Sequence, residues 1–241
     1  MKTTKYIISI SFLIVYHLIA ATPALADEVP ITPYQASYKL YKGGIQVAKS
    51  SLLLEQSGRF WRWRLSTRPK GIYNLFSNKK PYSETTFSLL DGQYRIHNIL
   101  LADEADDARY ETARFNWDSR QVDIQRKGKR RIEDLPAQVY DFHTIHLLTA
   151  QMMKDGTQQM EINFYLKGEV LDAMITQTGK VTLEINGSKI ETSVFQQTIS
   201  GRKISSKYYY GPDSRLVPVK IEHTNSKGKT AIMLLNQVNR L

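Results

Sequence analysis

Two histidines three residues apart, His143 and His146, form the pair in this sequence that could bind a metal ion, with Asp141 close by. On a helix, positions i and i+3 lie on the same side, so both rings could reach one ion. Two ligands at this spacing are common by chance, and the His-Glu-x-x-His pattern of zinc proteases is absent from the sequence. We therefore predict no metal and no cofactor, and a structural role for the segment that begins near Asp141.

Nucleophilic catalysis has little support in the residue types. The sequence has no cysteine and no Gly-x-Ser-x-Gly motif, although a serine triad can be assembled from distant segments. Four carboxylates that could serve sugar hydrolysis fall in the segment 102–110, "ADEADDARY", which is typical of a solvated acidic loop. We therefore expect no enzymatic activity, and a hydrolase with a scattered site is the least favoured alternative.

Aromatic and basic side chains are concentrated in the segments 59–69, 69–82 and 207–218. Aromatic rings can pack on an apolar ligand or stack on a sugar, and arginine and lysine attract anions. The candidate ligand-binding residues are Trp61, Trp63, Ile72, Tyr73, Leu75, Phe76, Tyr208 and Tyr210, and the candidate contacts to an anionic partner are Arg62, Arg64, Lys79 and Lys80.

These segments also have structural interpretations. The segment 69–82, "PKGIYNLFSNKKPY", could form a lid, a membrane-surface contact or a flap on its own domain. In "RFWRWRLSTRP", Trp61 and Trp63 alternate with Arg62 and Arg64, as in a half-buried strand. Because buried unpaired guanidinium groups are very costly, we predict that both tryptophans face inward with Leu65.

The elements that must position these residues are mostly strands. Period-two alternation separated by turn dipeptides predicts about seven strands, one helix and about seven more strands, among them separate strands at 170–176 and 180–185. The helix is predicted at about 141–155, with Asp141 as N-cap and Gly156 as C-cap. The predicted fold is mostly β: an antiparallel, strongly bent sheet or incomplete barrel wrapped around one central helix.

The N-terminus indicates export. A short basic region, an apolar run and the site Ala24-Leu25-Ala26 predict a signal peptide over 1–26, and a single β-rich exported domain over 27–241. We expect a periplasmic, monomeric protein with no transmembrane segment after cleavage. The net charge of +10 favours anionic envelope components, and nucleic acid is not an expected partner of an exported protein.

Five segments, taken in their order along the chain, resemble the secreted bacterial proteins of the domain of unknown function 3108 family. They are "YKGGIQVAKSSLLL", "SETTFSLLDGQYRI", "FNWD", "YDFHTIHLL" and "RLVPVKIE". The resemblance covers most of residues 34–240 and rests on structural positions such as Gly44, Glu84 and Pro218. It implies an exported β-rich fold and carries over no activity and no catalytic residue. After Asp141 the family pattern often reads leucine-serine, whereas this chain has Phe142-His143.

The function predicted from these observations is an exported cell-envelope binding or carrier module for a hydrophobic or amphipathic ligand such as a lipid. A concave antiparallel sheet is well suited to shelter such a ligand. The alternative is a non-enzymatic assembly or scaffolding factor that binds envelope protein or wall glycan through aromatic and basic surfaces.

Overall fold

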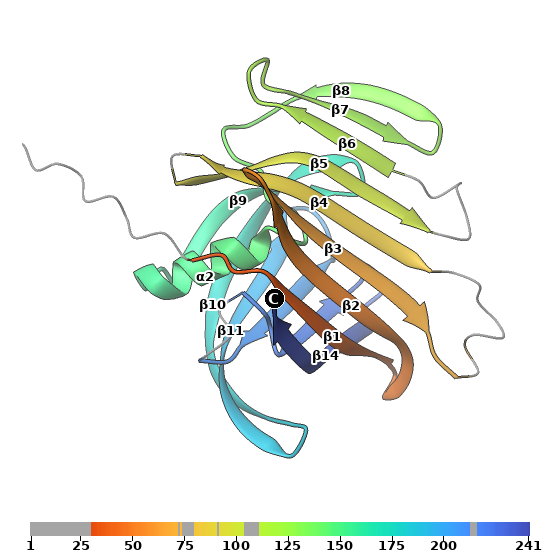
Figure 1. The fold of residues 1–241 in the computed structure, drawn as a ribbon, viewed down its shortest axis with the longest axis vertical. Helices are drawn as coiled ribbons and strands as arrows, with labels where there is room; N and C mark the ends of the chain where they lie inside the picture. Colours follow the sequence, from red (N-terminus) through yellow and green to blue (C-terminus); the bar gives the residue numbers. More distant parts are fainter. Residues whose placement is uncertain (1–29, 72, 74–79, 91, 104–110, 213–215) are drawn as a thin grey trace, which may run out of the picture.

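The computed structural model describes residues 30–71, 73, 80–90, 92–103, 111–212 and 216–241. Within these residues, fourteen strands form one antiparallel sheet that curves around a single helix, α2 (Figure 1). The predicted strongly bent sheet around a central helix is confirmed. The predicted signal peptide, residues 1–26, and the predicted new N-terminus at Asp27 lie outside the described residues. Among the described residues, no helix is long and apolar enough to cross a membrane.

Eight strands precede the helix: β1 (Tyr34–Lys42), β2 (Ile45–Ser57), β3 (Phe60–Pro69), β4 (Pro81–Leu90), β5 (Gln93–Asp103), β6 (Glu111–Asn116), β7 (Gln121–Arg126) and β8 (Lys129–Asp134). The helix, α2, spans Ile145–Asp155. Six strands follow: β9 (Gln159–Leu166), β10 (Glu169–Ile185), β11 (Ser188–Ile199), β12 (Ser205–Tyr210), β13 (Lys220–Thr224) and β14 (Thr230–Arg240).

The division into eight and six strands corrects the expected seven and seven. β8 is almost fully exposed, so its residues show no alternation that would have revealed it. The two strands expected at 170–176 and 180–185 are one continuous strand, β10, whose register against β11 shifts between Gln177 and Gly179. Such an irregularity bends a strand without ending it.

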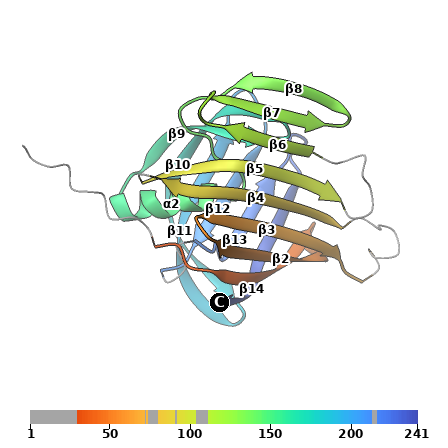
Figure 2. The same ribbon diagram turned by 45° about the horizontal axis from the view of Figure 1, so that its top comes forward.

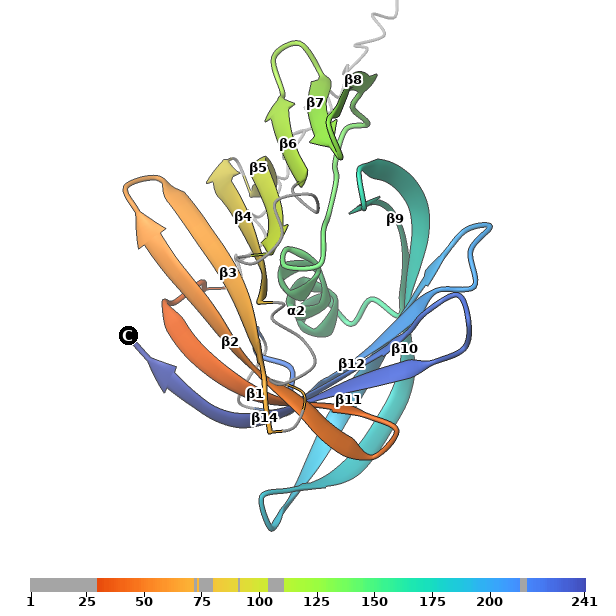
Figure 3. The same cartoon turned by 90° about the vertical axis from the view of Figure 1, so that its right-hand side faces the viewer.

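The sheet order follows the chain order except at one junction. Each strand pairs with its sequence neighbours except β8 and β9, which do not pair with each other, and β1 also pairs with β14, so that Tyr34 lies opposite Arg240. We call β1–β8 the first arm and β9–β14 the second arm. Figure 2 shows the strands of the first arm side by side, and Figure 3 shows the two arms on either side of α2. The first and last strands thus lie in the middle of the sheet, and its edges are β8 and β9.

The helix joins the two arms because it buries side chains toward both. Leu147 and Ala150 belong to a core cluster with residues of the first arm. Ile145, Leu148 and Met152 belong to a second cluster with residues of β9–β13. The helical spacing of Phe142, Ile145, Leu148 and Met152 in the sequence predicts one apolar stripe. That prediction is confirmed at Ile145, Leu148 and Met152, which are all buried.

The start of the helix is a correction. The helix was expected from about Asp141, but it begins at Ile145, and its N-cap, Thr144, makes no side-chain capping bond. Asp141 instead caps the turn before the helix: its Oδ1 accepts hydrogen bonds from the backbone N–H groups of His143 and Thr144 at 3.2 and 2.8 Å. An aspartate followed by a helical pattern is typical of both arrangements, so the pattern did not distinguish them.

The predicted C-cap is confirmed. Gly156 has a left-handed backbone, with φ of 70°, and its N–H bonds back to the Met152 carbonyl. We expect Gly156→Ala to lower the free energy of unfolding by about 1 kcal/mol, because a Cβ is disfavoured in this conformation. Urea denaturation measures the change. Gly156→Asn is the matched control and should cost less, since asparagine tolerates this backbone; equal losses in both variants would contradict the explanation.

Side chains also connect the far ends of the arms. The Tyr165 hydroxyl of β9 donates to Glu111 Oε1 of β6 at 3.0 Å, and Glu111 forms an ion pair with Arg126 of β7. The Arg131 guanidinium of β8 bonds to the carbonyl of Gly168 in the β9–β10 turn. The arms are therefore linked at their edges by side chains, and the sheet forms an incomplete barrel.

Candidate ligand-binding cavity

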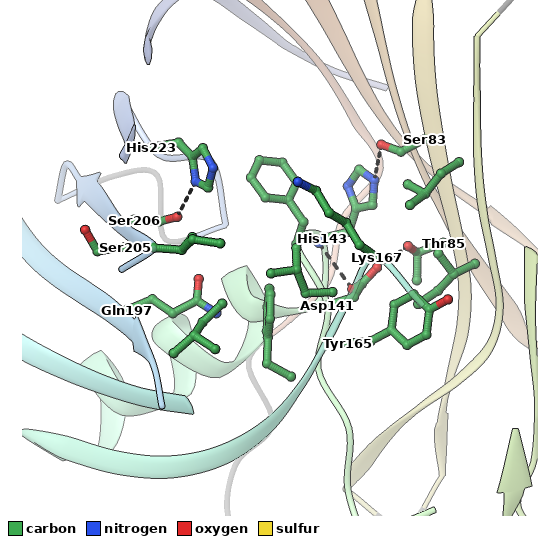
Figure 4. Close-up of a pocket in the computed structure, with 17 residues that line it drawn as sticks. Ser83, Thr85, Asp141, His143, Tyr165, Lys167, Gln197, Ser205, Ser206 and His223 are labelled. Carbon is green, nitrogen blue, oxygen red and sulfur yellow. Dashed lines mark hydrogen bonds between the residues drawn. The ribbon is translucent and has the colours of Figure 1, made fainter. Parts of the chain in front are cut away.

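A cavity of about 280 Å³ lies beside the turn that precedes α2, between the two arms (Figure 4). Its apolar walls are Ile99, Leu101, Phe142, Phe164, Leu166, Ile199 and Ile204. Its polar groups are Ser83, Thr85, Asp141, His143, Tyr165, Lys167, Gln197, Ser205, Ser206 and His223. The cavity thus draws on β4, β5, β9, β11, β12 and β13, strands that are far apart in the sequence.

The turn over residues 140–144 is held by both arms. The backbone of Tyr140 pairs with β9: its N–H donates to the Asn163 carbonyl at 2.9 Å, and its carbonyl accepts from the Tyr165 N–H at 2.7 Å. On the other side, the Thr85 hydroxyl of β4 donates to Asp141 Oδ2. The turn is therefore fixed against the cavity, and the side chains of Phe142 and His143 face it.

The Asp141 carboxylate is buried but well satisfied. Besides Thr85 and the two backbone N–H groups described above, it accepts a hydrogen bond from the Thr144 hydroxyl at 2.7 Å. A buried carboxylate with four donors has little capacity left for a further partner. Its role is to fix the turn, and the predicted structural role of this segment agrees with that geometry.

His143 is buried with one ring nitrogen paired and the other free. Its Nε2 lies 3.0 Å from the Ser83 hydroxyl, and its ring stacks near Trp63 with centroids 6.3 Å apart. Its Nδ1 is buried and has no hydrogen-bond partner among the described residues. Burial lowers the pKa of this ring below its ordinary value, although the Asp141 charge acts in the opposite direction. At neutral pH the ring is therefore uncharged.

Gln197 presents a second free polar atom on the opposite wall. Its Oε1 accepts a hydrogen bond from the Tyr208 hydroxyl at 2.9 Å, which fixes the orientation of the amide. Its Nε2 is buried and has no partner among the described residues. In Figure 4, Gln197 lies on one side of the cavity with Ser206 and His223, and His143 lies on the other with Ser83 and Thr85.

A second serine–histidine pair lines the same cavity. Ser206 Oγ lies 3.1 Å from His223 Nδ1. Burial and, next, the positive charge of Lys167 hold the pKa of His223 below its ordinary value. Among the described residues, no three His, Asp or Glu side chains are grouped so that they could hold a metal ion.

The aromatic residues predicted to bind a ligand are placed in the core. Trp63, Tyr208 and Tyr210 are fully buried and Trp61 is 8% exposed, and none of the four lines the cavity. The polar atoms of the three fully buried rings have protein partners: Trp63 Nε1 donates to the Tyr34 hydroxyl, the Tyr208 hydroxyl donates to Gln197 Oε1, and the Tyr210 hydroxyl lies 2.7 Å from His146 Nδ1. The inward orientation predicted for the tryptophans is confirmed, but these rings form the fold rather than a binding surface.

The basic candidates that lie within the described residues are exposed. Arg62 and Arg64 are exposed; Arg62 forms an ion pair with Glu55, and the Arg64 guanidinium lies 5.3 Å from the centre of the Tyr82 ring. Lys80 and Tyr73 are also exposed. The candidates Ile72, Leu75, Phe76 and Lys79 lie outside the described residues. Binding of an anionic partner to the basic candidates stays a prediction.

Residues that line the cavity were missed in the sequence, although a signal was present. Thr85 in β4 and Gln197 in β11 stand two residues from the buried Phe87 and Phe195, on the same inward faces. A polar residue at a core position of an alternating strand is uncommon and indicates a buried hydrogen bond or a site. His223 and Ser206 have no comparable signal, because each is ordinary in an exposed strand.

The fold has relatives among solved structures. A crystal structure of a β-barrel-like protein of domain of unknown function DUF1849 from Brucella abortus superposes with a TM-score of 0.59 at 9% identity, covering 88% of this chain and 99% of that one. A putative exported protein with a YmcC-like fold from Bacteroides fragilis reaches a TM-score of 0.32 at 8% identity, covering 88% and 98%. The first likeness shows a shared barrel-like fold.

The sequence comparisons agree with the resemblance seen in the motifs. A search of curated proteins gave no match. A family profile matches residues 33–235, which span every strand from β1 to β13 and the first part of β14. The chain belongs to the family described as protein of unknown function (DUF3108).

Proposed function

We propose that this protein is a non-enzymatic binding module of the cell envelope that holds a small amphipathic molecule, or one end of a lipid, in the cavity beside α2. The observation that carries the proposal is a mainly apolar cavity with two buried polar atoms, His143 Nδ1 and Gln197 Nε2, that lack a protein partner. An unpaired buried polar group costs about 1–3 kcal/mol, and proteins rarely leave one without a reason. A ligand that pairs with these atoms would remove that cost.

The size of the cavity limits the ligand. Its 280 Å³ lies just below the range of about 300–1,000 Å³ that is typical of small-molecule sites. A whole two-chain lipid is too large, so the occupant is a small molecule or the end of a longer one.

The geometry of the Ser83–His143 pair supports binding rather than catalysis. In a catalytic triad the second ring nitrogen of the histidine bonds to a group that orients the ring. His143 lacks such a partner among the described residues, because Asp141 bonds to backbone N–H groups instead. Ser83 therefore has a neighbouring base that is not oriented for proton transfer.

The location of the protein follows from its N-terminal sequence. The basic region, apolar run and Ala24-Leu25-Ala26 site support export by a signal peptide. A periplasmic location would give the protein access to lipids and lipid fragments of the envelope. Binding of an envelope protein or wall glycan remains the alternative.

Native mass spectrometry of protein purified from its host tests the proposal. We expect a bound small molecule in the wild-type protein and its loss in Leu101→Trp, because an indole at this half-buried wall position would fill the cavity. Val181→Trp is the matched control: Val181 is 45% exposed on β10 and does not line the cavity, so the ligand should remain. A ligand retained equally in both variants would contradict the proposed site, and a co-purified protein without a small molecule would favour the assembly-factor alternative.

A further inference from the structure

The free polar atoms in the cavity have a defined chemical character. Gln197 Nε2 can only donate, because it is an amide nitrogen, and the amide oxygen is already paired with the Tyr208 hydroxyl. Its two N–H groups have no acceptor among the described residues. On the second arm, the cavity wall therefore carries hydrogen-bond donors that a ligand acceptor could pair with.

The histidine on the opposite wall can supply another donor. The neutral His143 ring carries one proton, and its Nε2 is paired with the Ser83 hydroxyl. When that hydroxyl donates to Nε2, the proton resides on Nδ1, which is the free atom. Ser83 can rotate its hydroxyl hydrogen, so the pair can adapt to a ligand that needs a donor from His143.

A positive charge lies at the same cavity. Lys167 lines the cavity from the β9–β10 turn, and its side chain is exposed. Its positive charge helps to lower the pKa of His223 on the second arm. The other charged group on the wall, the Asp141 carboxylate, remains negative, but its oxygens already accept four hydrogen bonds and are not free to pair with a ligand. The remaining titratable groups of the wall are His143, His223 and Tyr165, and none of them adds a negative charge at neutral pH.

We propose that the ligand carries a carboxylate, whose oxygens accept hydrogen bonds from Gln197 Nε2–H and His143 Nδ1–H beside the Lys167 ammonium, while its apolar chain lies along Leu101, Phe164 and Ile199. This inference rests on the proposed function and specifies its ligand class as monocarboxylates with an aliphatic chain. Hydrogen bonds to a charged group are roughly twice as strong as neutral ones, so the carboxylate would dominate recognition.

Calorimetric titration with four eight-carbon probes tests the proposal: octanoate, methyl octanoate, octanol and octylamine. They share a chain of a size that suits the cavity and differ in the head group. We expect octanoate to bind at least about tenfold more tightly than octanol or the methyl ester, from the charge-assisted hydrogen bonds. Octylamine should bind most weakly, because its ammonium meets donors and a lysine.

Two variants separate head-group recognition from structural damage. Gln197→Met removes the donors at similar size and should reduce the octanoate-to-octanol affinity ratio by about tenfold. Lys167→Gln, at an exposed position, should lower octanoate affinity and its salt dependence while octanol affinity is unchanged. The control Ile199→Val should weaken octanoate and octanol by the same factor, since this residue contacts only the chain.

The outcomes distinguish this inference from the function on which it rests. Tighter binding of octanoate, with a ratio that falls in Gln197→Met and Lys167→Gln, supports a carboxylate site. Equal affinity for octanoate, octanol and the ester, or a preference for octylamine, overturns the carboxylate and leaves the binding module in place. If no probe binds and no small molecule co-purifies with the wild-type protein, both proposals fail.

Discussion

Replacing Trp63 with alanine should lower the free energy of unfolding by about 3–5 kcal/mol. The side chain is fully buried in the core cluster of the first arm. Its ring lies 5.5 Å from Phe87 and 5.9 Å from His146, centroid to centroid, and its Nε1 donates to the Tyr34 hydroxyl at 3.0 Å. The substitution would leave a large cavity and would remove the donor to the buried Tyr34 hydroxyl, which would keep only its own bond to the Leu216 carbonyl. Both effects are destabilising.

The neighbouring arginines provide the control for this loss. Arg62 and Arg64 occupy the same strand but face solvent, and the Arg62–Glu55 pair is a surface ion pair. Arg62→Ala with Arg64→Ala should change stability by no more than about 1 kcal/mol in urea denaturation. A loss in the double variant as large as that in Trp63→Ala would contradict the assignment of the two faces.

Fluorescence checks the same assignment without a destabilising change. Trp63 is fully buried and Trp61 nearly so, whereas Trp117 is half-buried. In Trp117→Phe, we expect iodide to quench the remaining emission only weakly until the protein unfolds. Strong quenching in the folded state would mean that the β3 tryptophans are exposed.

Acid should destabilise the protein between about pH 6.5 and pH 5, before most carboxylates titrate. Burial, together with the neighbouring His143, lowers the pKa of His146 to about 3. In the unfolded chain this ring has a pKa of about 6.5. Between the two values the unfolded state binds a proton that the folded state does not, so stability falls as the pH is lowered.

The contribution of His146 to the slope of that loss can be separated from that of the other histidines. A single proton corresponds to about 1.4 kcal/mol of unfolding free energy per pH unit, and His143, His97 and His223, whose pKa values are also lowered, act in the same direction. Urea denaturation at several pH values measures the slope. His146→Gln should reduce the slope by the contribution of about one proton, or about 1.4 kcal/mol per pH unit.

His97→Gln is the matched control for His146→Gln. The His97 ring is only half-buried and is paired with Ser88. Its pKa is lowered by burial and then by the nearby positive charges of Arg59 and Arg95. We expect the His97 variant to change the slope less. A slope that is unchanged in His146→Gln would mean that the buried ring is protonated in the folded state.

Much of the fold is readable from the sequence because strand patterns and turn residues are local. The alternation of Trp61 and Trp63 with arginines decided which face of β3 is buried, and Gly156 marked the end of the helix. Where the pattern was weak, local reasoning failed. The exposed strand β8 has no apolar face to detect, and the polar turn before α2 resembles a helix start.

The candidate site could not be read in the same way, because it exists only where the arms meet. Thr85 and Asp141 are separated by 56 residues, and Ser83 and His143 by 60, yet each pair forms a hydrogen bond. Asp141 and His143 attracted attention in the sequence as metal ligands, whereas the structure uses them to fix a turn and to line a cavity.

By itself, the sequence determined the β-rich class, the presence of the helix before β9, the inward face of β3 and the family. Only the tertiary structure decided that β1 pairs with β14, that Tyr208 and Tyr210 are core residues, and that Gln197 faces His143 across a cavity. The physical reason is that alternation specifies which side of a strand is buried, but not which strands meet there. The curvature of the sheet around α2 brings distant inward positions together. The buried polar atoms that remain without a hydrogen-bond partner there, His143 Nδ1 and Gln197 Nε2, define the site.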